Sequence, residues 1–198
     1  MNAQETNPTN SPTPAPQPRP PKKDKRTNIS WADALAVAIA LAWILPEIVA
    51  LASHGIISAR LSPAVAGGLH FADLDSGPQT LYTVALALKF IGILATVFLV
   101  THTFSDMSKG QFFTEKNSRR LTAAWISILV FLIARLGLEG MANNWAATQL
   151  GIDWWQDPGT TTPLSDLAPA LVLACVLAAL ATALRRGAKL EEDVDGLV

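Results

Sequence analysis

The sequence predicts an all-α membrane protein: a four-helix transmembrane bundle with both termini cytoplasmic and a disordered Pro-rich N-terminal tail. Three observations lead to this fold class. Half of the 198 residues are hydrophobic and 16% are charged, whereas a typical soluble domain is about 25% charged. The apolar residues gather in four long runs. The positive charges alternate between rich and poor segments from one side of each run to the other.

Residues 1–30 are predicted to form a disordered, basic tail. Seven prolines lie between positions 8 and 21, and five lysines and arginines lie between Arg19 and Arg26. Such a segment buries too little apolar surface to offset the entropy of ordering it. A ligand for an aromatic-lined, polyproline-binding groove is the alternative interpretation. Residues 31–198 are predicted to form one membrane domain.

Four segments of this domain are predicted to cross the membrane, at about residues 32–53, 80–104, 116–141 and 166–187. A helix needs about 20 apolar residues to span the hydrocarbon core. Each segment is predicted to be helical because backbone groups within lipid must be paired inside the segment. Small residues four apart let helices approach closely, so two alanine-rich stripes are candidate contacts: Ala34, Ala38 and Ala42, and Ala170, Ala174, Ala178 and Thr182.

The loops predict the orientation. Five lysines and arginines precede the first span, one lies in the first loop, and four lie between the second and third spans. The third loop has none, and three follow the fourth span. Because positive charge is enriched on the cytoplasmic side, we expect a multi-pass protein of the cell (inner) membrane, with its N and C termini both inside.

Four ionisable side chains lie within the predicted spans, namely Glu47, Lys89, Arg135 and Glu139. A charge near the bilayer centre costs about 2.5–3.5 kcal/mol on insertion scales, so such groups usually pair inside the bundle. The rise per residue places the first three about 5–6 Å outside the midplane, and Glu139 one turn further on the face of Arg135. We predict a neutral, buried charge network that fixes helix register. The alternative is a site that binds a polar ligand or moves a proton.

Motifs for catalysis are missing from the sequence. It contains no H-E-x-x-H zinc motif, P-loop, G-x-S-x-G elbow or dinucleotide-binding G-x-G-x-x-G. The histidines are scattered, and the single cysteine, Cys175, lies in an apolar run. We therefore expect no catalytic residue, no metal site and no cofactor, and we predict that the chain is not an enzyme.

Two short motifs lie on the expected cytoplasmic side. The first, before the third span, has as candidate interface residues Gly110, Phe113, Thr114, Asn117, Arg119 and Arg120. The second, after the fourth span, has Gly187, Leu190, Glu191, Asp195 and Gly196. Thr114 can cap the third span, with Glu115 favourable against the helix dipole. With the four spans, these motifs resemble the bacterial membrane family catalogued as domain of unknown function 2975, over roughly residues 30–198.

The resemblance implies no established activity. It implies four-helix membrane proteins often encoded beside a small helix-turn-helix regulator, and hence, by analogy, a membrane partner for a cytoplasmic DNA-binding protein. We expect a scaffold or regulatory partner of a cytoplasmic protein. A transporter-like or ligand-sensing protein that uses the intramembrane charges, and an accessory subunit of a larger membrane complex, stay open. The expected partners are the lipid bilayer, a cytoplasmic protein and homo- or hetero-oligomers, without direct contact to nucleic acid.

Overall fold

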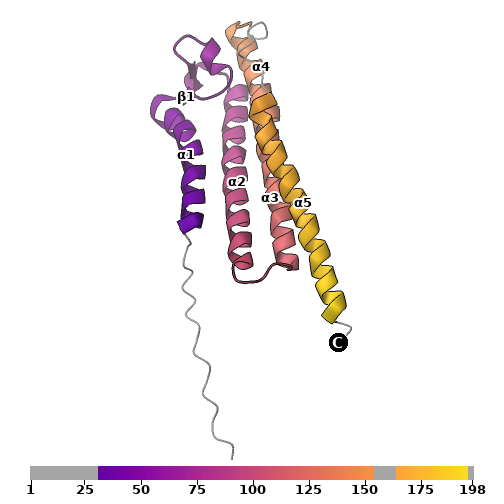
Figure 1. Cartoon of the computed structure of the whole chain (residues 1–198). Helices are drawn as coiled ribbons and strands as arrows, with labels where there is room; N and C mark the ends of the chain where they lie inside the picture. The colour runs from indigo at the N-terminus through magenta and orange to yellow at the C-terminus, as the bar shows by residue number, and fades with distance from the viewer. Residues whose placement is uncertain (1–30, 154–163, 196–198) are drawn as a thin grey trace, which may run out of the picture.

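The computed structural model describes residues 31–153 and 164–195 (Figure 1). The predicted tail, residues 1–30, and Gly196 lie outside the described residues. Long helices form most of the described chain, and their bounds are α1 (Trp31–His54), α2 (Ser76–Met107), α3 (Glu115–Ile133), α4 (Glu139–Leu150) and α5 (Leu164–Asp195). A π-helical turn, η3 (Ala134–Leu138), joins α3 to α4.

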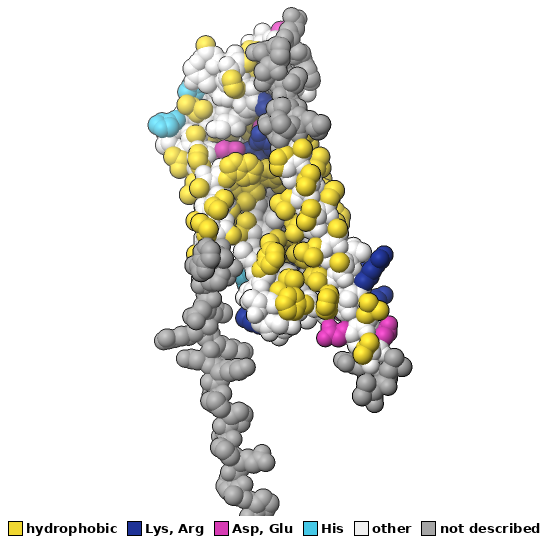
Figure 2. Space-filling model, viewed as in Figure 1, with side chains coloured by type: hydrophobic (Ala, Val, Ile, Leu, Met, Phe, Trp, Pro, Cys, Tyr) yellow, Lys and Arg dark blue, Asp and Glu magenta, His cyan; other side chains and the backbone are white. Residues whose placement is uncertain are grey.

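Four helical segments are long and apolar enough to cross a membrane, which confirms the predicted four-helix fold. These segments are Ala34–His54, Ser76–Met107, Glu115–Leu150 and Leu167–Val194. Figure 2 shows apolar side chains over the middle of the molecule, between two ends that carry charged side chains. Residues with an apolar side chain exposed over more than half of its surface include Ile91, Phe98, Ile133, Val172 and Val176. In lipid such a surface is solvated rather than buried, so it needs no protein cover.

The bundle core lies between α2, α3 and α5. Its buried members come chiefly from α3 and α5, namely Leu121, Ala124, Ile128, Phe131, Leu132, Ala174, Leu177, Ala181 and Leu184. Gly92 on α2 allows a close approach to α3, because a Cβ atom there would lie 2.9 Å from the Ser127 carbonyl oxygen. Helix α1 packs mainly against α2 and the loop that follows α1 (Figure 1).

The prediction that an alanine stripe on the first helix packs against the other helices is wrong. Ala34, Ala38 and Ala42 are exposed, and the buried residues of α1 are Ala40 and Ile44. A helix that is apolar all round carries no sequence signal for the face that packs. On α5 the predicted stripe is partly buried, but the buried face itself repeats at Ala174, Leu177, Ala181 and Leu184.

A folded cap closes the bundle between α1 and α2, where no structure was predicted. It contains a two-stranded antiparallel hairpin, β1 (Ile56–Ile57) with β2 (Leu69–His70), and two 3-10 turns, η1 (Ser62–Ala64) and η2 (Phe71–Asp73). Leu61 and Leu69 are fully buried in it and pack in one cluster with Tyr82, Ala142 and Ala146. The cap therefore has its own small core against α2 and α4.

Side-chain amides fasten this cap to the bundle. Asn143 Oδ1 on α4 accepts hydrogen bonds from the Tyr82 hydroxyl at 2.7 Å and from the Leu61 backbone N–H at 3.4 Å. Gln149 accepts from the Asp75 N–H at 2.9 Å and donates to the Asp73 carbonyl at 3.1 Å. These bonds pair backbone groups of the cap that would otherwise be unsatisfied at a largely apolar interface.

Candidate functional site

Three of the four predicted intramembrane charges meet in one buried cluster, here called the charge triad (Glu47, Lys89 and Glu139). Lys89 Nζ donates to Glu47 Oε2 at 2.6 Å and to Glu139 Oε2 at 3.0 Å. The side chains of Lys89 and Glu139 are 7% and 3% exposed, and that of Glu47 is 27% exposed. Because the triad joins α1, α2 and α4, it fixes the register of three elements at once.

The triad borders a very small cavity beneath the cap. The cavity has a volume of about 20 Å³ and is lined by Glu47, Leu51, Ile57, Ser58, Ala59, Tyr82, Leu86, Lys89 and Glu139. That volume is enough for about one water molecule, whereas small-molecule sites usually measure about 300–1,000 Å³. This geometry favours the structural interpretation of the charges over passage of a polar substrate.

Arg135 lies apart from the triad. Its side chain makes no ion pair or hydrogen bond within the described part of the chain, and it is half-buried. It lines a different cavity of about 470 Å³, here called the Arg135 groove, together with Trp43, Phe131, Leu132, Leu167, Pro169, Ala170 and Leu173. The ring centroids of Trp43 and Phe131 lie 5.5 Å apart at its wall. The four residues predicted to form one network therefore form a triad, and the Arg135 guanidinium lies outside it.

A π-helical turn interrupts the helix where Arg135 and Glu139 lie. Arg135 lies inside η3, and Glu139 is the first residue of α4, directly after it. A π turn holds one residue more than the α-helical geometry, so later side chains are displaced by about 100° around the axis. The expectation that Arg135 and Glu139 share a face assumed an unbroken α-helix. The break turns Glu139 towards Lys89 and leaves Arg135 on the side of α5.

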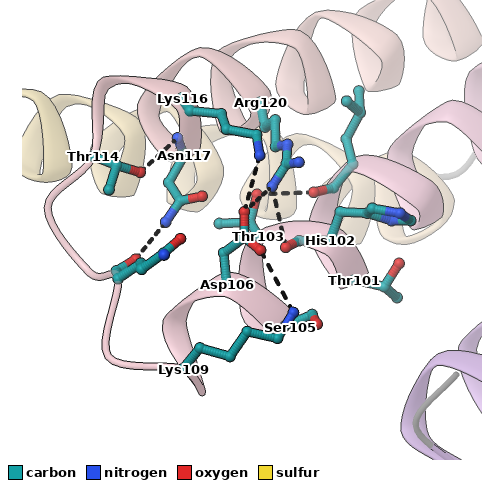
Figure 3. Close-up of polar contacts among 12 residues, drawn as sticks. Thr101, His102, Thr103, Ser105, Asp106, Lys109, Thr114, Lys116, Asn117 and Arg120 are labelled. Atoms are coloured by element: carbon teal, nitrogen blue, oxygen red, sulfur yellow. Dashed lines mark hydrogen bonds and ion pairs between the residues drawn. The ribbon is translucent and has the colours of Figure 1, made fainter. Parts of the chain in front are cut away.

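At the other end of the bundle, Asp106 gathers three cations around the α2–α3 turn (Figure 3). Asp106 Oδ2 lies 2.7 Å from Arg120 Nη1 and 3.5 Å from Lys116 Nζ, and Asp106 Oδ1 lies 3.9 Å from Lys109 Nζ. Arg120 also donates to the His102 carbonyl at 3.2 Å. This acid tightens the turn and neutralises part of a basic segment. The sequence interpretation missed its role, although a carboxylate close to four cations was a usable signal.

The first predicted motif has a structural role at this turn. Thr114 is the N-cap of α3, as predicted, and its side chain accepts from the Asn117 backbone N–H at 3.2 Å. Asn117 is fully buried, and its Nδ2 donates to the Gln111 carbonyl at 2.7 Å. Gly110 has a φ of +83°, a conformation that favours glycine, at the bend before the cap. Gly110, Thr114 and Asn117 therefore fix the conformation of the turn.

The two predicted motifs meet in space. Phe113 from the turn lies over Gly187 on α5, where an added Cβ atom would come within 2.9 Å of three ring atoms of Phe113. Beside this contact, a cleft of about 430 Å³ runs between α3 and α5 and is lined by Glu115, Ser118, Arg119, Arg185, Ala188, Lys189 and Glu192. The motif residues Arg119, Leu190 and Glu191 are exposed. The side chain of Asp195 lies outside the described residues.

No family model, curated protein or solved structure matches this chain. We therefore infer function from the geometry of the triad, the Arg135 groove and the end that carries the two motifs.

Proposed function

We propose that this chain is a non-catalytic membrane protein that docks a cytoplasmic protein partner on one end of its bundle. The docking surface consists of the α2–α3 turn and the last turns of α5. One observation carries the proposal: Leu190 and Val194 are 66% and 61% exposed on a helical extension outside the apolar run. Large apolar side chains that are exposed beyond the lipid mark interaction surfaces.

The length of α5 supports a surface outside the membrane. The apolar run of α5 ends before Arg185, and the helix continues to Asp195. Eleven further residues, 185–195, extend about 16 Å along the axis, so the end of α5 stands clear of a hydrocarbon core about 30 Å thick. Figure 1 shows α5 extending past the α2–α3 turn. The half-exposed rings of Phe112 and Phe113 lie on that turn.

The charges of this end indicate the chemistry of the partner. Glu191, Glu192 and Asp193 are exposed beside Leu190 and Val194. An apolar centre flanked by acids suits a basic partner with an apolar anchor, because apolar anchors supply affinity and complementary charges supply specificity. A small basic DNA-binding regulator would be such a partner, and it is the kind that the family resemblance implies. We place this end in the cytoplasm, on the positive-inside rule.

Co-purification in mild detergent, followed by mass identification, tests the proposal. We expect a reproducible protein companion whose recovery falls about tenfold in the double variant Leu190→Ser, Val194→Ser, since loss of an anchor costs 1–2 kcal/mol or more. Asn144→Ser, an exposed polar change on α4 at the opposite end of the bundle, is the control. A reporter fused after Val198 must be active in the cytoplasm. The proposal fails if there is no companion or if the reporter is active outside.

A further inference from the structure

The Arg135 groove combines two features that rarely coexist in a membrane protein. Its walls are apolar and aromatic, and its one charged lining residue is a guanidinium without a carboxylate partner in the described part of the chain. Charged groups inside a membrane usually pair or face water, because an isolated charge in lipid is costly. The groove volume of about 470 Å³ is in the range of sites that hold small molecules. Arg135 is therefore open to pairing with an anion that enters the groove.

The position of Arg135 along its helix indicates where this anion comes from. Arg135 lies 15 residues beyond Arg120, or about 22 Å along the axis. With Arg120 near one boundary of a core about 30 Å thick, Arg135 lies about 8 Å inside the other. Arginine side chains extend towards the interface from such depths. The guanidinium can thus reach the headgroup region while its stem stays among apolar groups.

We propose that the Arg135 groove binds an anionic phospholipid. The phosphate pairs with the Arg135 guanidinium, which matches phosphate oxygens in a bidentate geometry. One acyl chain lies against Trp43, Phe131 and Leu173. A zwitterionic lipid binds less well, because its own ammonium group already accompanies the phosphate. The π turn that carries Arg135 agrees with a binding role, because single π turns are frequent at functional sites.

Native mass spectrometry of the full chain tests this site. The protein in detergent is mixed with equal amounts of phosphatidylglycerol and phosphatidylcholine of the same acyl composition. We expect the wild type to retain the anionic lipid in at least about tenfold excess, as expected for a hydrogen-bonded charge pair. Arg135→Gln should abolish the excess. The matched control, Arg119→Gln, removes an exposed arginine at the opposite end of α3 and should keep it.

A second variant tests the contribution of the groove independently of the charge of Arg135. Leu173→Trp fills the groove and leaves Arg135 in place, so it should also abolish retention of the anionic lipid. Equal retention of both lipids by the wild type would overturn the proposal, as would undiminished retention by Arg135→Gln. A loss in Arg119→Gln as large as that in Arg135→Gln would place the lipid at the basic end and would contradict the assignment to the groove.

Discussion

Lys89 and Arg135 are both cations within membrane-spanning helices, yet their surroundings differ. Lys89 is buried and hydrogen-bonded to two carboxylates, at 2.6 and 3.0 Å. Arg135 is half-buried in an apolar groove and has no partner in the parts of the chain that the structure describes. The sequence assigned both to one network. The ion-paired Lys89 stabilises the fold. The guanidinium of Arg135 in the groove, unpaired among the described residues, is available to bind a ligand.

The charge count sharpens this difference. With all three members ionised, the triad holds two carboxylates and one ammonium, so its formal charge is −1, and Arg135 would have made it neutral. Lys89 is therefore shared between two acids. The stability of this end of the bundle should depend strongly on Lys89 and little on Arg135.

Lys89→Leu should have the largest effect, because it leaves Glu47 and Glu139 facing each other without a cation. Removal of one partner from a buried pair costs about 3–5 kcal/mol. We expect a large fall in melting temperature in detergent and a low membrane yield. The double variant Lys89→Leu, Glu139→Leu should regain part of this loss, because Glu47 is the member nearest solvent. A single variant that melts like the wild type would refute a stabilising triad.

The close contact between α2 and α3 at Gly92 should give the next largest effect. A Cβ atom on Gly92 would lie 2.9 Å from the Ser127 carbonyl oxygen and 3.1 Å from Phe131 Cβ. Gly92→Ala should cost about 1–3 kcal/mol by overpacking, measured as a lower melting temperature. Gly140→Ala is the matched control, because nothing lies within 4 Å of its added Cβ atom. Equal melting temperatures of the two variants would show that α2 and α3 can move apart without loss of stability.

Much of the fold, and part of the triad, could be predicted from the sequence. Apolar runs of about 20 residues predict the four helices. Charged residues at similar depth predict a network of Glu47, Lys89, Arg135 and Glu139, of which all but Arg135 meet. The N-cap at Thr114 also follows from local sequence, since a threonine followed by an acid suits the start of a helix. These features depend on solvent and on neighbours along the chain, which composition and spacing describe well.

The remaining features depend on packing between distant segments. No residue pattern marks the π turn at 134–138, so the face of Glu139 relative to Arg135 could not be predicted. The cap depends on contacts of Leu61 and Leu69 with α2 and α4, although Gly67 and Gly68, both at positive φ, were a usable turn signal. The role of Asn143 could not be predicted either, because its side chain bonds to Leu61 of the cap and to Tyr82, which are distant in the sequence.

Arg135→Leu should have the smallest effect on the isolated protein, and this tests the comparison most directly. The substitution breaks no ion pair among the described residues, so in detergent without anionic lipid the stability should change by about 0.5 kcal/mol or less. With phosphatidylglycerol added, the melting temperature of the wild type should rise, because a ligand that binds the folded state stabilises it, and that of the variant should not. Arg119→Leu should respond like the wild type. A loss in lipid-free detergent as large as that of Lys89→Leu would mean that Arg135 is held within the protein, and the contrast between the two cations would disappear.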